Sequence, residues 1–360
     1  EKNTASFVSE KLKGFDIDVH TGIGGTGVVG VISGKKKSTK KSRAIGLRAD
    51  MDALPMEEKT NLPYTSKSPG IMHACGHDGH TTMLLGAARY LAKTRKFEGT
   101  VYCIFQPAEE GGNGGARSMI KDGLFERFKM DSIWGMHNWP GLEVGKAVAH
   151  CGAAMAGADI FIITVEGNGG HAAMPHLTND PVAATGMIIV SLQNLVSRQL
   201  DPFDQAVISL TRLDAGSAYN VIPPSATIGG TLRTMKPKTR KLMIEKIQNV
   251  ARSAAKTLGC KVSMELRPGY PPTLNHETDA LFARGVIEDV LGKNGLDIEM
   301  TPVMGAEDFS YMLAQKAGAY IWLGAGENSE NLHSPHFDFN DTILPIGASF
   351  WARLVEKKLA

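Results

Sequence analysis

Several short apolar segments of this chain run directly into turns that carry polar residues or glycine. Four of them share the pattern: RAIGLRAD (43–50), TVYCIFQPAEE (100–110), SIWGMHN (132–138) and AYIWLGAG (319–326). Runs of this kind are typical of buried strands. A helical pattern at 80–96 separates the first two, and strands that alternate with helices indicate an α/β layer structure. Sites in such sheets lie at the carboxyl ends of the strands, where PAEE and MHN fall.

The middle of the chain follows a different order. Four strand patterns lie at 158–167, 205–214, 225–235 and 260–269, and two helix patterns lie between them at 180–200 and 238–259. The first helix would begin with Asp180 as N-cap and Pro181 at its first helical position. The order β-α-β-β-α-β is that of the ferredoxin-like split unit.

These patterns predict two domains. Residues 1–156 and 273–360 would form a discontinuous α/β domain with a central, mostly parallel sheet flanked by helices. A ferredoxin-like (βαββαβ) domain would be inserted at 157–272.

Composition excludes several classes of protein. The 360 residues are 42% hydrophobic and 21% charged, as in an ordinary globular protein, and no apolar run reaches the ~18–20 residues of a membrane span. The net charge of +2 is too small to indicate nucleic acid, and the basic run KKKSTKK (35–41) lacks interleaved aromatic residues, so we interpret it as a solvated loop. Because the chain begins with Glu rather than Met, we expect that it lacks its true N-terminus.

The four cysteines are dispersed: Cys75, Cys103, Cys151 and Cys260. A disulfide framework normally shows dense, even spacing in a short secreted chain. Reduced thiols and a cytoplasmic location are therefore predicted.

The stretch HACGHDGH (73–80) places Cys75 and His77 two residues apart. In an extended turn, two such side chains can converge on one ion. A polar helix cap with a buried thiol is an equal alternative, because Cys-x-His is a weaker spacing signal than Cys-x-x-Cys. We interpret His73 and His80 as turn and helix-cap residues.

Two adjacent glutamates, Glu109 and Glu110, follow a strand pattern in QPAEEGGNGG (106–115). Neighbouring carboxylates repel unless a cation lies between them or one of them stays protonated. One can therefore bind a metal ion while the other carries a proton, and a solvated acidic turn is the alternative. His137 and His333 also lie near strand ends, although a lone histidine there is more often structural.

The combination of these clusters at the strand ends of one sheet is harder to explain by chance than any single one. Mixed nitrogen, oxygen and sulfur ligands suit zinc or a similar first-row ion. Five or six ligands exceed what one tetrahedral ion needs, and two-metal sites recur in hydrolases. The sequence thus predicts two divalent metal ions, Mn²⁺ or Zn²⁺, with Co²⁺ and Ni²⁺ as further candidates.

A series of motifs between residues 47 and 337 resembles peptidase family M20, the aminoacylase and carboxypeptidase family. In chain order they are LRADMDALPM, HACGHDGHTTMLLGAA, FQPAEEGGNGGARSMI, GMHNWPG, GGHAAMPH, GTLRTM, GAEDFSYM and LHSPHF. The resemblance is strongest to the amidohydrolase subfamily, which includes hippurate hydrolases, N-acyl-amino-acid amidohydrolases and auxin-conjugate hydrolases. It implies a catalytic α/β domain with an inserted lid.

The resemblance also implies roles for individual residues. It implies five metal ligands: Cys75, His77, Glu110, His137 and His333. Glu109 would be the general base, and Asp52 would support a ligand histidine, unless it is only a strand-end turn residue. Asp308 lies in the family motif GAEDF, but no chemical role is assigned to it.

Three residues of the lid match substrate-binding positions of the family. His171 would bind the carbonyl oxygen, often in the site of a neighbouring subunit. Asn220 and Arg233 resemble positions that contact the acyl or carboxylate end of the substrate, and an arginine can grip a carboxylate through two parallel hydrogen bonds. The alternatives are an exposed loop histidine, a turn residue and an outward strand residue.

The reaction implied is hydrolysis of the amide bond in a small N-acyl-L-amino acid, such as hippurate or an N-acetyl amino acid. Water activated by two cations would attack the carbonyl carbon, Glu109 would take the proton, and His171 would help to stabilise the oxyanion. A carboxypeptidase or dipeptidase and an N-acetyl-diaminopimelate deacetylase are alternatives, and a metal-binding or redox-sensing protein without turnover is a remote one. The sequence contains no G-x-S-x-G of a serine hydrolase. No nucleic-acid or membrane partner is expected. The resemblance implies a homodimer or homotetramer that forms through the lid.

Overall fold

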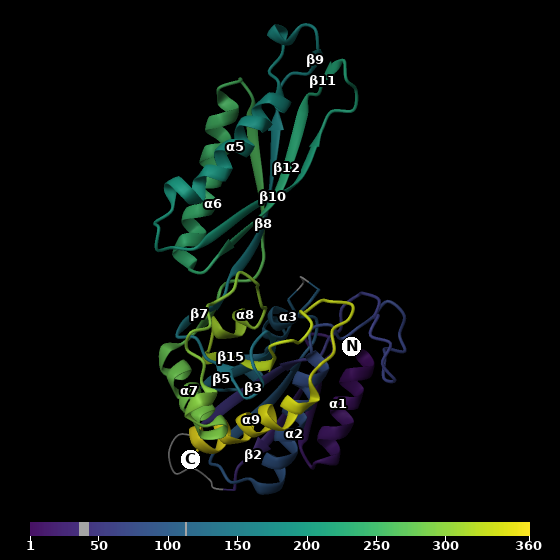
Figure 1. Ribbon diagram of the computed structural model, residues 1–360, viewed down its shortest axis with the longest axis vertical. Coiled ribbons are helices and arrows are strands. Elements are labelled where there is room, and N and C mark those ends of the chain that lie inside the picture. Colours follow the sequence, from purple (N-terminus) through teal and green to yellow (C-terminus); the bar gives the residue numbers. More distant parts are fainter. Residues whose placement is uncertain (36–42, 112–113) are drawn as a thin grey trace. The chain divides into compact units, whose positions relative to one another are not determined.

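The computed structural model describes residues 1–35, 43–111 and 114–360 (Figure 1). The chain divides into two compact units. Unit 1 comprises Glu1–Ala154, Leu274–Thr301 and Asp308–Ala360, and unit 2 comprises Met155–Thr273 and Pro302–Glu307. The short segment 302–307 groups with unit 2 because the backbone N–H of Ala156 donates to the carbonyls of Val303 and Gly305, at 3.1 and 2.9 Å. Except for Lys35, the basic run at 35–41 lies outside the described residues.

A seven-stranded sheet forms the centre of unit 1, in the order β1-β2-β4-β3-β5-β15-β6. The strands are β1 (Asp18–Ile23), β2 (Gly27–Ser33), β3 (Ala44–Asp50), β4 (Thr100–Gln106), β5 (Ser132–Pro140), β6 (Ala147–Val148) and β15 (Ala317–Gly326). The inner strands β4, β3, β5 and β15 are parallel, as predicted. At the two edges β2 pairs with β4, β1 with β2 and β6 with β15, all antiparallel.

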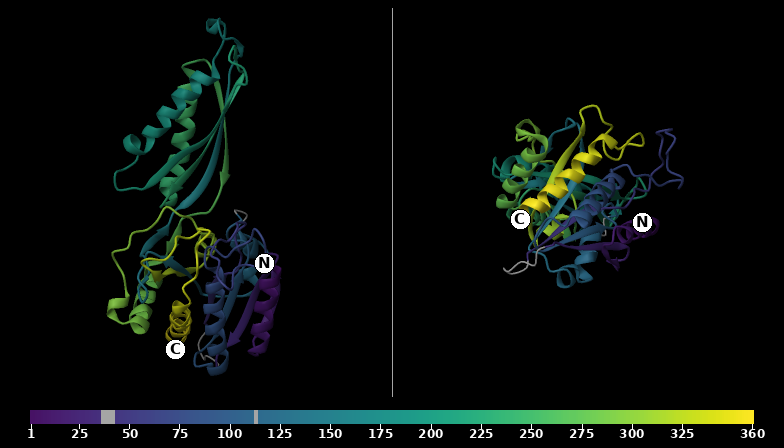
Figure 2. Two further views of the ribbon diagram at one scale, coloured as in Figure 1. Left: turned by 45° about the vertical axis from the view of Figure 1, so that its right-hand side comes forward. Right: turned by 90° about the horizontal axis from the view of Figure 1, so that it is seen from below.

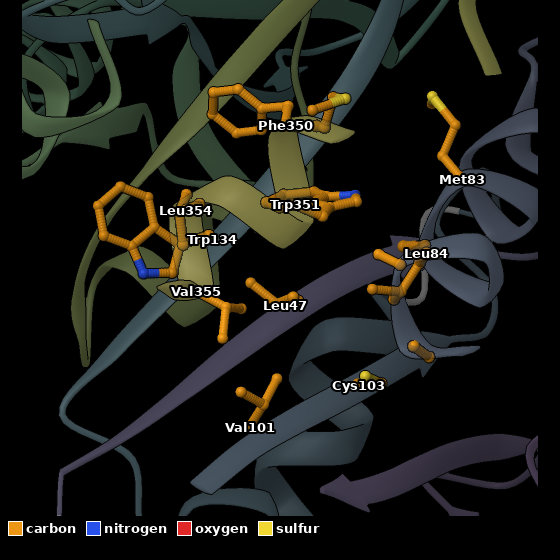
Figure 3. Close-up of a cluster of buried hydrophobic side chains, with 14 of the residues drawn as sticks. Leu47, Met83, Leu84, Val101, Cys103, Trp134, Phe350, Trp351, Leu354 and Val355 are labelled. Carbon is orange, nitrogen blue, oxygen red and sulfur yellow. The ribbon is translucent and has the colours of Figure 1, made fainter. Parts of the chain in front are cut away.

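Four long helices pack side by side in unit 1: α1 (Lys2–Gly14), α2 (His77–Thr94), α9 (Leu344–Lys358) and α7 (Glu277–Leu291). Their apolar faces meet the sheet in one core, in which Leu47 of β3, Leu84 of α2 and Trp351 of α9 are buried (Figure 3). The helix predicted at 80–96 is α2, which begins three residues earlier. Its start is set by Gly76, which has a φ of 88°, a conformation that glycine adopts without strain.

Unit 2 has the predicted order β-α-β-β-α-β, with two very short strands added. Its strands β8 (Gly157–Glu166), β10 (Ala206–Ala215), β12 (Ser225–Thr234) and β13 (Lys261–Pro268) form an antiparallel sheet in the order β10-β12-β8-β13. Helices α5 (Pro181–Gln199) and α6 (Pro237–Lys256) lie on the same side of this sheet (Figure 2). As predicted, Asp180 caps α5, because its side chain accepts hydrogen bonds from the backbone of Val182 and Ala183.

The remaining elements are short. They are α3 (Gly115–Lys121), α4 (Leu124–Arg127), β7 (Gly152–Met155), β9 (Gly170–His171), η1 (Pro175–Leu177), β11 (Val221–Ile222), β14 (Thr273–Asn275), η2 (Lys293–Gly295), α8 (Ser310–Leu313) and η3 (Asp341–Ile343). Within the described residues, every helix is too short or too polar to cross a bilayer.

Candidate metal centre

The side chains predicted to bind metal all belong to unit 1 and lie close to the carboxyl ends of its inner strands. Cys75 and His77 stand at the start of α2, which follows β3. Glu110 follows β4, His137 lies in the second half of β5, and His333 follows β15. Because neighbouring parallel strands end at the same edge of a sheet, residues distant in sequence converge there.

The ligand atom of each of these five side chains lies within 4 Å of that of at least one other member of the set. Cys75 Sγ is 3.4 Å from His137 Nε2. Glu110 Oε1 is 3.1 Å from His333 Nε2 and 3.9 Å from His77 Nε2. The structure therefore brings together all the residues that the sequence predicted as ligands.

Two overlapping sets of three side chains could each hold an ion. The ligand atoms of Cys75, His77 and His137 all lie within 4.8 Å of one another, and so do those of Cys75, Glu110 and His333. Cys75 belongs to both sets. Two ions that share one ligand require an arrangement of this kind.

The imidazole rings have the tautomers that metal binding needs. His77 Nδ1–H donates to Asp52 Oδ1 at 3.1 Å, and His137 Nδ1–H donates to the carbonyl of Asn138 at 2.6 Å. In its neutral form, each ring therefore carries a lone pair on Nε2, the atom that faces the cluster. His77 Nε2 is buried and has no hydrogen-bond partner, although a buried polar atom normally has one. A metal ion fits this atom.

Burial controls the ionisation of the cluster. It raises the pKa of the Cys75 thiol well above its ordinary value, so a metal ion must displace the thiol proton in order to bind. It lowers the pKa of His137, which keeps the neutral form that coordinates metal. Burial alone would also lower the pKa of His77, but the Asp50 carboxylate, Cys75 and the hydrogen bond to Asp52 together outweigh burial. The pKa of His77 is therefore raised, and a metal ion must displace a proton from this ring as well.

Asp52 joins the histidine to residues 107–111, which follow β4 and carry Glu109 and Glu110 and are called the acidic turn below. Its Oδ1 accepts the hydrogen bond from His77, and its Oδ2 accepts one from the backbone N–H of Glu110 at 3.0 Å. Burial raises the pKa of Asp52, but the hydrogen bond and charge of His77 outweigh it and leave the pKa lowered. An ionised Asp52 thus fixes both the ring of His77 and the backbone that carries Glu110.

Glu109 lies beside this set rather than pointing to solvent. It is 7% exposed, and its carboxylate lies within 4.8 Å of the ligand atoms of His77 and Glu110. The backbone N–H of Asp308 donates to its Oε1 at 3.4 Å. Residues 112 and 113 of the predicted glycine-rich turn lie outside the described residues.

The interpretation of His80 as a helix-cap residue is wrong, whereas His73 lies in the turn before α2 as predicted. His80 is buried in the first turn of α2, where its Nδ1–H donates to Asp50 Oδ1 at 2.6 Å. Its Nε2 accepts the backbone N–H of Asn138 at 3.0 Å. His80 therefore ties α2 to β3 and β5. No local pattern marks it, because both partners are distant in sequence.

The predicted substrate-binding residues belong to unit 2. His171 and Asn220 lie together at the small sheet of β9 and β11: His171 pairs with Val221, and the carbonyl of Asn220 accepts from Ala172 N at 3.0 Å. Arg233 is half-buried near the carboxyl end of β12, where it pairs with Val207. The ten-residue length of β12 separates its two ends by about 30 Å at ~3.3 Å per residue. The structure therefore places His171 and Arg233 apart within the unit.

A cavity of about 960 Å³ borders the cluster, and Asp52 and Glu110 form part of its wall. The other titratable side chains of its wall are Glu1, Lys2, Glu58, His73, Asp78, Asp338 and Asp341. Carboxylates predominate, and a field of one sign raises the local concentration of cations.

Comparison with known proteins places this geometry in a family. The family described as Peptidase family M20/M25/M40 matches residues 46–357. This chain belongs to peptidase family M20/M25/M40. The hippurate hydrolase of Campylobacter jejuni is 44% identical over 356 residues, which cover 99% of this chain and 91% of the relative.

Two further similar proteins agree with this family assignment. The IAA-amino acid hydrolase ILR1-like 4 of Arabidopsis thaliana is 38% identical, and the match covers 100% of this chain and 82% of the relative. The crystal structure of Bacillus subtilis YxeP, a dinuclear metal binding peptidase from the M20 family, is 33% identical with a TM-score of 0.87, and the match covers 100% of this chain and 92% of that one. The M20 fold thus extends over the whole chain.

Proposed function

We propose that this M20 protein is a metal-dependent amidohydrolase that cleaves the amide bond of small N-acyl-L-amino acids, such as hippurate or N-acetyl amino acids. The observation that carries the proposal is the pair of ligand sets that share Cys75, with Glu109 beside them. The names of the hippurate hydrolase and the IAA-amino acid hydrolase support a substrate in which an amino acid is joined to an acyl group.

Two divalent ions would be held by the two sets. Cys75, His77 and His137 would hold one, and Cys75, Glu110 and His333 the other. We propose Mn²⁺ or Zn²⁺, with Co²⁺ and Ni²⁺ as further candidates, because the ligands mix sulfur, nitrogen and oxygen. When bound, the ions supply Lewis acidity to a carbonyl oxygen and lower the pKa of water toward ~7.

Glu109 would act as the general base. Its carboxylate accepts a proton from the attacking water and then delivers that proton to the departing nitrogen. Glu110 cannot share this work while it is a metal ligand. Asp52 keeps Nδ1 of His77 protonated, and this leaves Nε2 free for the ion.

His171, Asn220 and Arg233 would bind the substrate. His171 would donate to the developing oxyanion, Asn220 would contact the acyl group, and Arg233 would grip the carboxylate. The separation of His171 from Arg233 within unit 2 supports a homodimer or homotetramer in which His171 serves a neighbouring subunit. The four free cysteines support a reducing compartment, and we propose the cytoplasm.

Replacement of Glu109 by Gln tests the proposal. Since the amide cannot take the proton, E109Q should lower kcat by about 10²–10⁴-fold on N-benzoyl and N-acetyl amino acids, the usual range for a general base. Metal analysis should show that E109Q still holds both ions, whereas the matched variant E110Q should lose one.

A near-normal rate in E109Q would refute the role of Glu109. Faster cleavage of dipeptides than of N-acyl amino acids by the native protein would replace the amidohydrolase proposal with a carboxypeptidase or dipeptidase.

A further inference from the structure

A buried charge network lies under the acidic turn, and Arg48 of β3 is its centre. Arg48 has no exposed surface, and its guanidinium donates to Gln106 Oε1 at 2.8 Å, Asp50 Oδ2 at 2.7 Å and Asp308 Oδ1 at 3.2 Å. All three partners are also fully buried. A buried charge is tolerated only when its partners are well placed, so the geometry of this network is tightly specified.

Asp308 connects the network to the strand before the acidic turn and to the helix α3 that comes later in the chain. Its Oδ1 also accepts from Gln106 Nε2 at 2.7 Å, and Gln106 is the last residue of β4, just before the turn. Its Oδ2 accepts from the backbone N–H of Ala116 at 2.9 Å, in the first turn of α3. One carboxylate therefore holds the strand β4, which leads into the turn, and the first turn of α3.

The same residue contacts the side chain of Glu109 from its own backbone. The N–H of Asp308 donates to Glu109 Oε1 at 3.4 Å. Anchoring the carboxylate of Asp308 therefore also fixes the direction of this N–H. A displacement of Asp308 would move the turn and release the rotamer of Glu109 together.

Two other carboxylates also hold the turn, through the backbone N–H groups of the residues on either side of Glu109. Glu1 Oε1 accepts from the N–H of Ala108 at 2.8 Å, and Asp52 Oδ2 accepts from Glu110. Ala108 has a φ of 50°, a conformation that costs a non-glycine residue energy and persists only where the surroundings enforce it. The acidic turn is thus held in a strained conformation by its neighbours.

We propose that Asp308 is a positioning residue for Glu109, and that Arg48 and Gln106 keep it in place. The proposal rests on the proposed function, in which Glu109 is the general base. Its physical basis is orientation, since a misplacement of about 1 Å at a reacting group can cost ~10²-fold in rate. Asp308 acts through Glu109 and does not itself touch the substrate.

The test is D308N, which keeps the shape of the side chain. Asn offers one acceptor oxygen, and if this oxygen faces Arg48 and Gln106, the NH₂ group must face the N–H of Ala116, where two donors repel. We expect kcat to fall by about 10–100-fold, within the cost of misorientation, while KM and the content of both metals stay near native values. In an E109Q background, D308N should have no further effect on kcat, because residues that act as a unit are not additive.

D159N in unit 2 is the matched control. Asp159 is 2% exposed and pairs with Arg240 through two hydrogen bonds of 2.7 and 2.6 Å. D159N should lower the Tm but leave kcat per folded molecule unchanged. If D308N does not fold, Q106M removes the bond from Gln106 to Asp308 and should lower kcat by about 3–10-fold, a smaller misorientation of the same kind.

A kcat in folded D308N within twofold of the native value would overturn the inference, as would loss of metal in proportion to loss of rate. An equal loss of kcat in D159N, or a further loss in the E109Q background, would show a merely structural role. Failure of the proposed function is separate, because it would appear as a near-normal rate in E109Q itself.

Discussion

The two units place buried polar groups in different ways. In unit 1, β3 is buried along its entire length and includes both Arg48 and Asp50, and further buried histidines and carboxylates gather at the same edge of the sheet. In unit 2, β8 alternates buried and partly exposed positions, and its core is apolar. The buried pair of Asp159 and Arg240 belongs to unit 2, but the structure gives it no metal-binding neighbours among the residues that are described.

This difference follows from the layering of each unit. In a parallel sheet the carboxyl ends of all strands lie along the same side, so side chains that are far apart in sequence can meet there. In the antiparallel sheet of unit 2, neighbouring strands run in opposite directions, so their carboxyl ends do not lie along one side. The proposed metal ligands and general base therefore belong to unit 1, whereas proposed substrate-binding residues such as His171 belong to unit 2.

Removing metal should have the largest effect and should act on unit 1. A chelator should abolish hydrolysis of N-acyl amino acids, and added Mn²⁺ or Zn²⁺ should restore it. Hydrogen exchange should accelerate near Cys75, Glu110 and His333, because a bound metal stabilises only the folded site. The exchange rates of β8 and β12 should not change. Full activity of a metal-free preparation, or an equal acceleration of hydrogen exchange in unit 2, would contradict the prediction that only unit 1 depends on metal.

Truncation of a core side chain in unit 2 should have the opposite effect to metal removal. It should lower the stability of unit 2 and leave unit 1 unchanged. Phe161 of β8 is 1% exposed, and Phe161→Ala should destabilise unit 2 by about 3–5 kcal/mol, the usual cost of such a cavity. Metal content should remain native, because every proposed ligand belongs to unit 1. Urea titrations followed by hydrogen exchange would measure this. Leu213→Ala, at a position 55% exposed, is the control and should change stability by about 0.5 kcal/mol or less. Loss of metal in the Phe161 variant would contradict the separation of the units.

Thiol labelling should give the smallest but most local readout. Burial raises the pKa of Cys103 in unit 1 to about 12 and also raises that of Cys260 in unit 2, so both are protonated at pH 8 and unreactive as thiolates. Exposed Cys151 should therefore be alkylated first, as detected by mass spectrometry, and C151S should remove this signal. Phe161→Ala should expose Cys260 but not Cys103. Rapid labelling of Cys103 in the native protein would contradict this prediction, because it would show that the alkylating reagent reaches the core of unit 1.

Local sequence signals account for much of the fold. The apolar runs predicted the inner strands of unit 1, and Asp180 with Pro181 marked the start of α5, because caps and periodicity depend on neighbours in sequence. The very short strands β9 and β11 were not predicted, since each consists of two residues whose pairing depends on a distant partner. The antiparallel edges of the large sheet escaped prediction for the same reason.

In the candidate site, the metal-binding and acidic residues were easier to predict than the buried residues that hold them in place. Cys75, His77 and the glutamate pair stand out because their side chains suit metal and lie in polar turns. Arg48 and Asp50 look like ordinary residues of an alternating strand, and only helices packed on the sheet bury both faces of β3. The anchoring of Asp308 to Ala116 and Gln106 joins residues far apart in sequence. No local pattern predicts these contacts.

The interruption of unit 1 by unit 2 has a consequence for synthesis on the ribosome. Strands β5 and β15 are parallel neighbours, yet the whole of unit 2 is translated between them, which takes several seconds or more at ~5–20 residues per second. Throughout that interval β5 has an open edge, and His333 does not yet exist. A nascent chain that stalls before residue 317 would expose this apolar edge, a template for aggregation that a chaperone would have to shield.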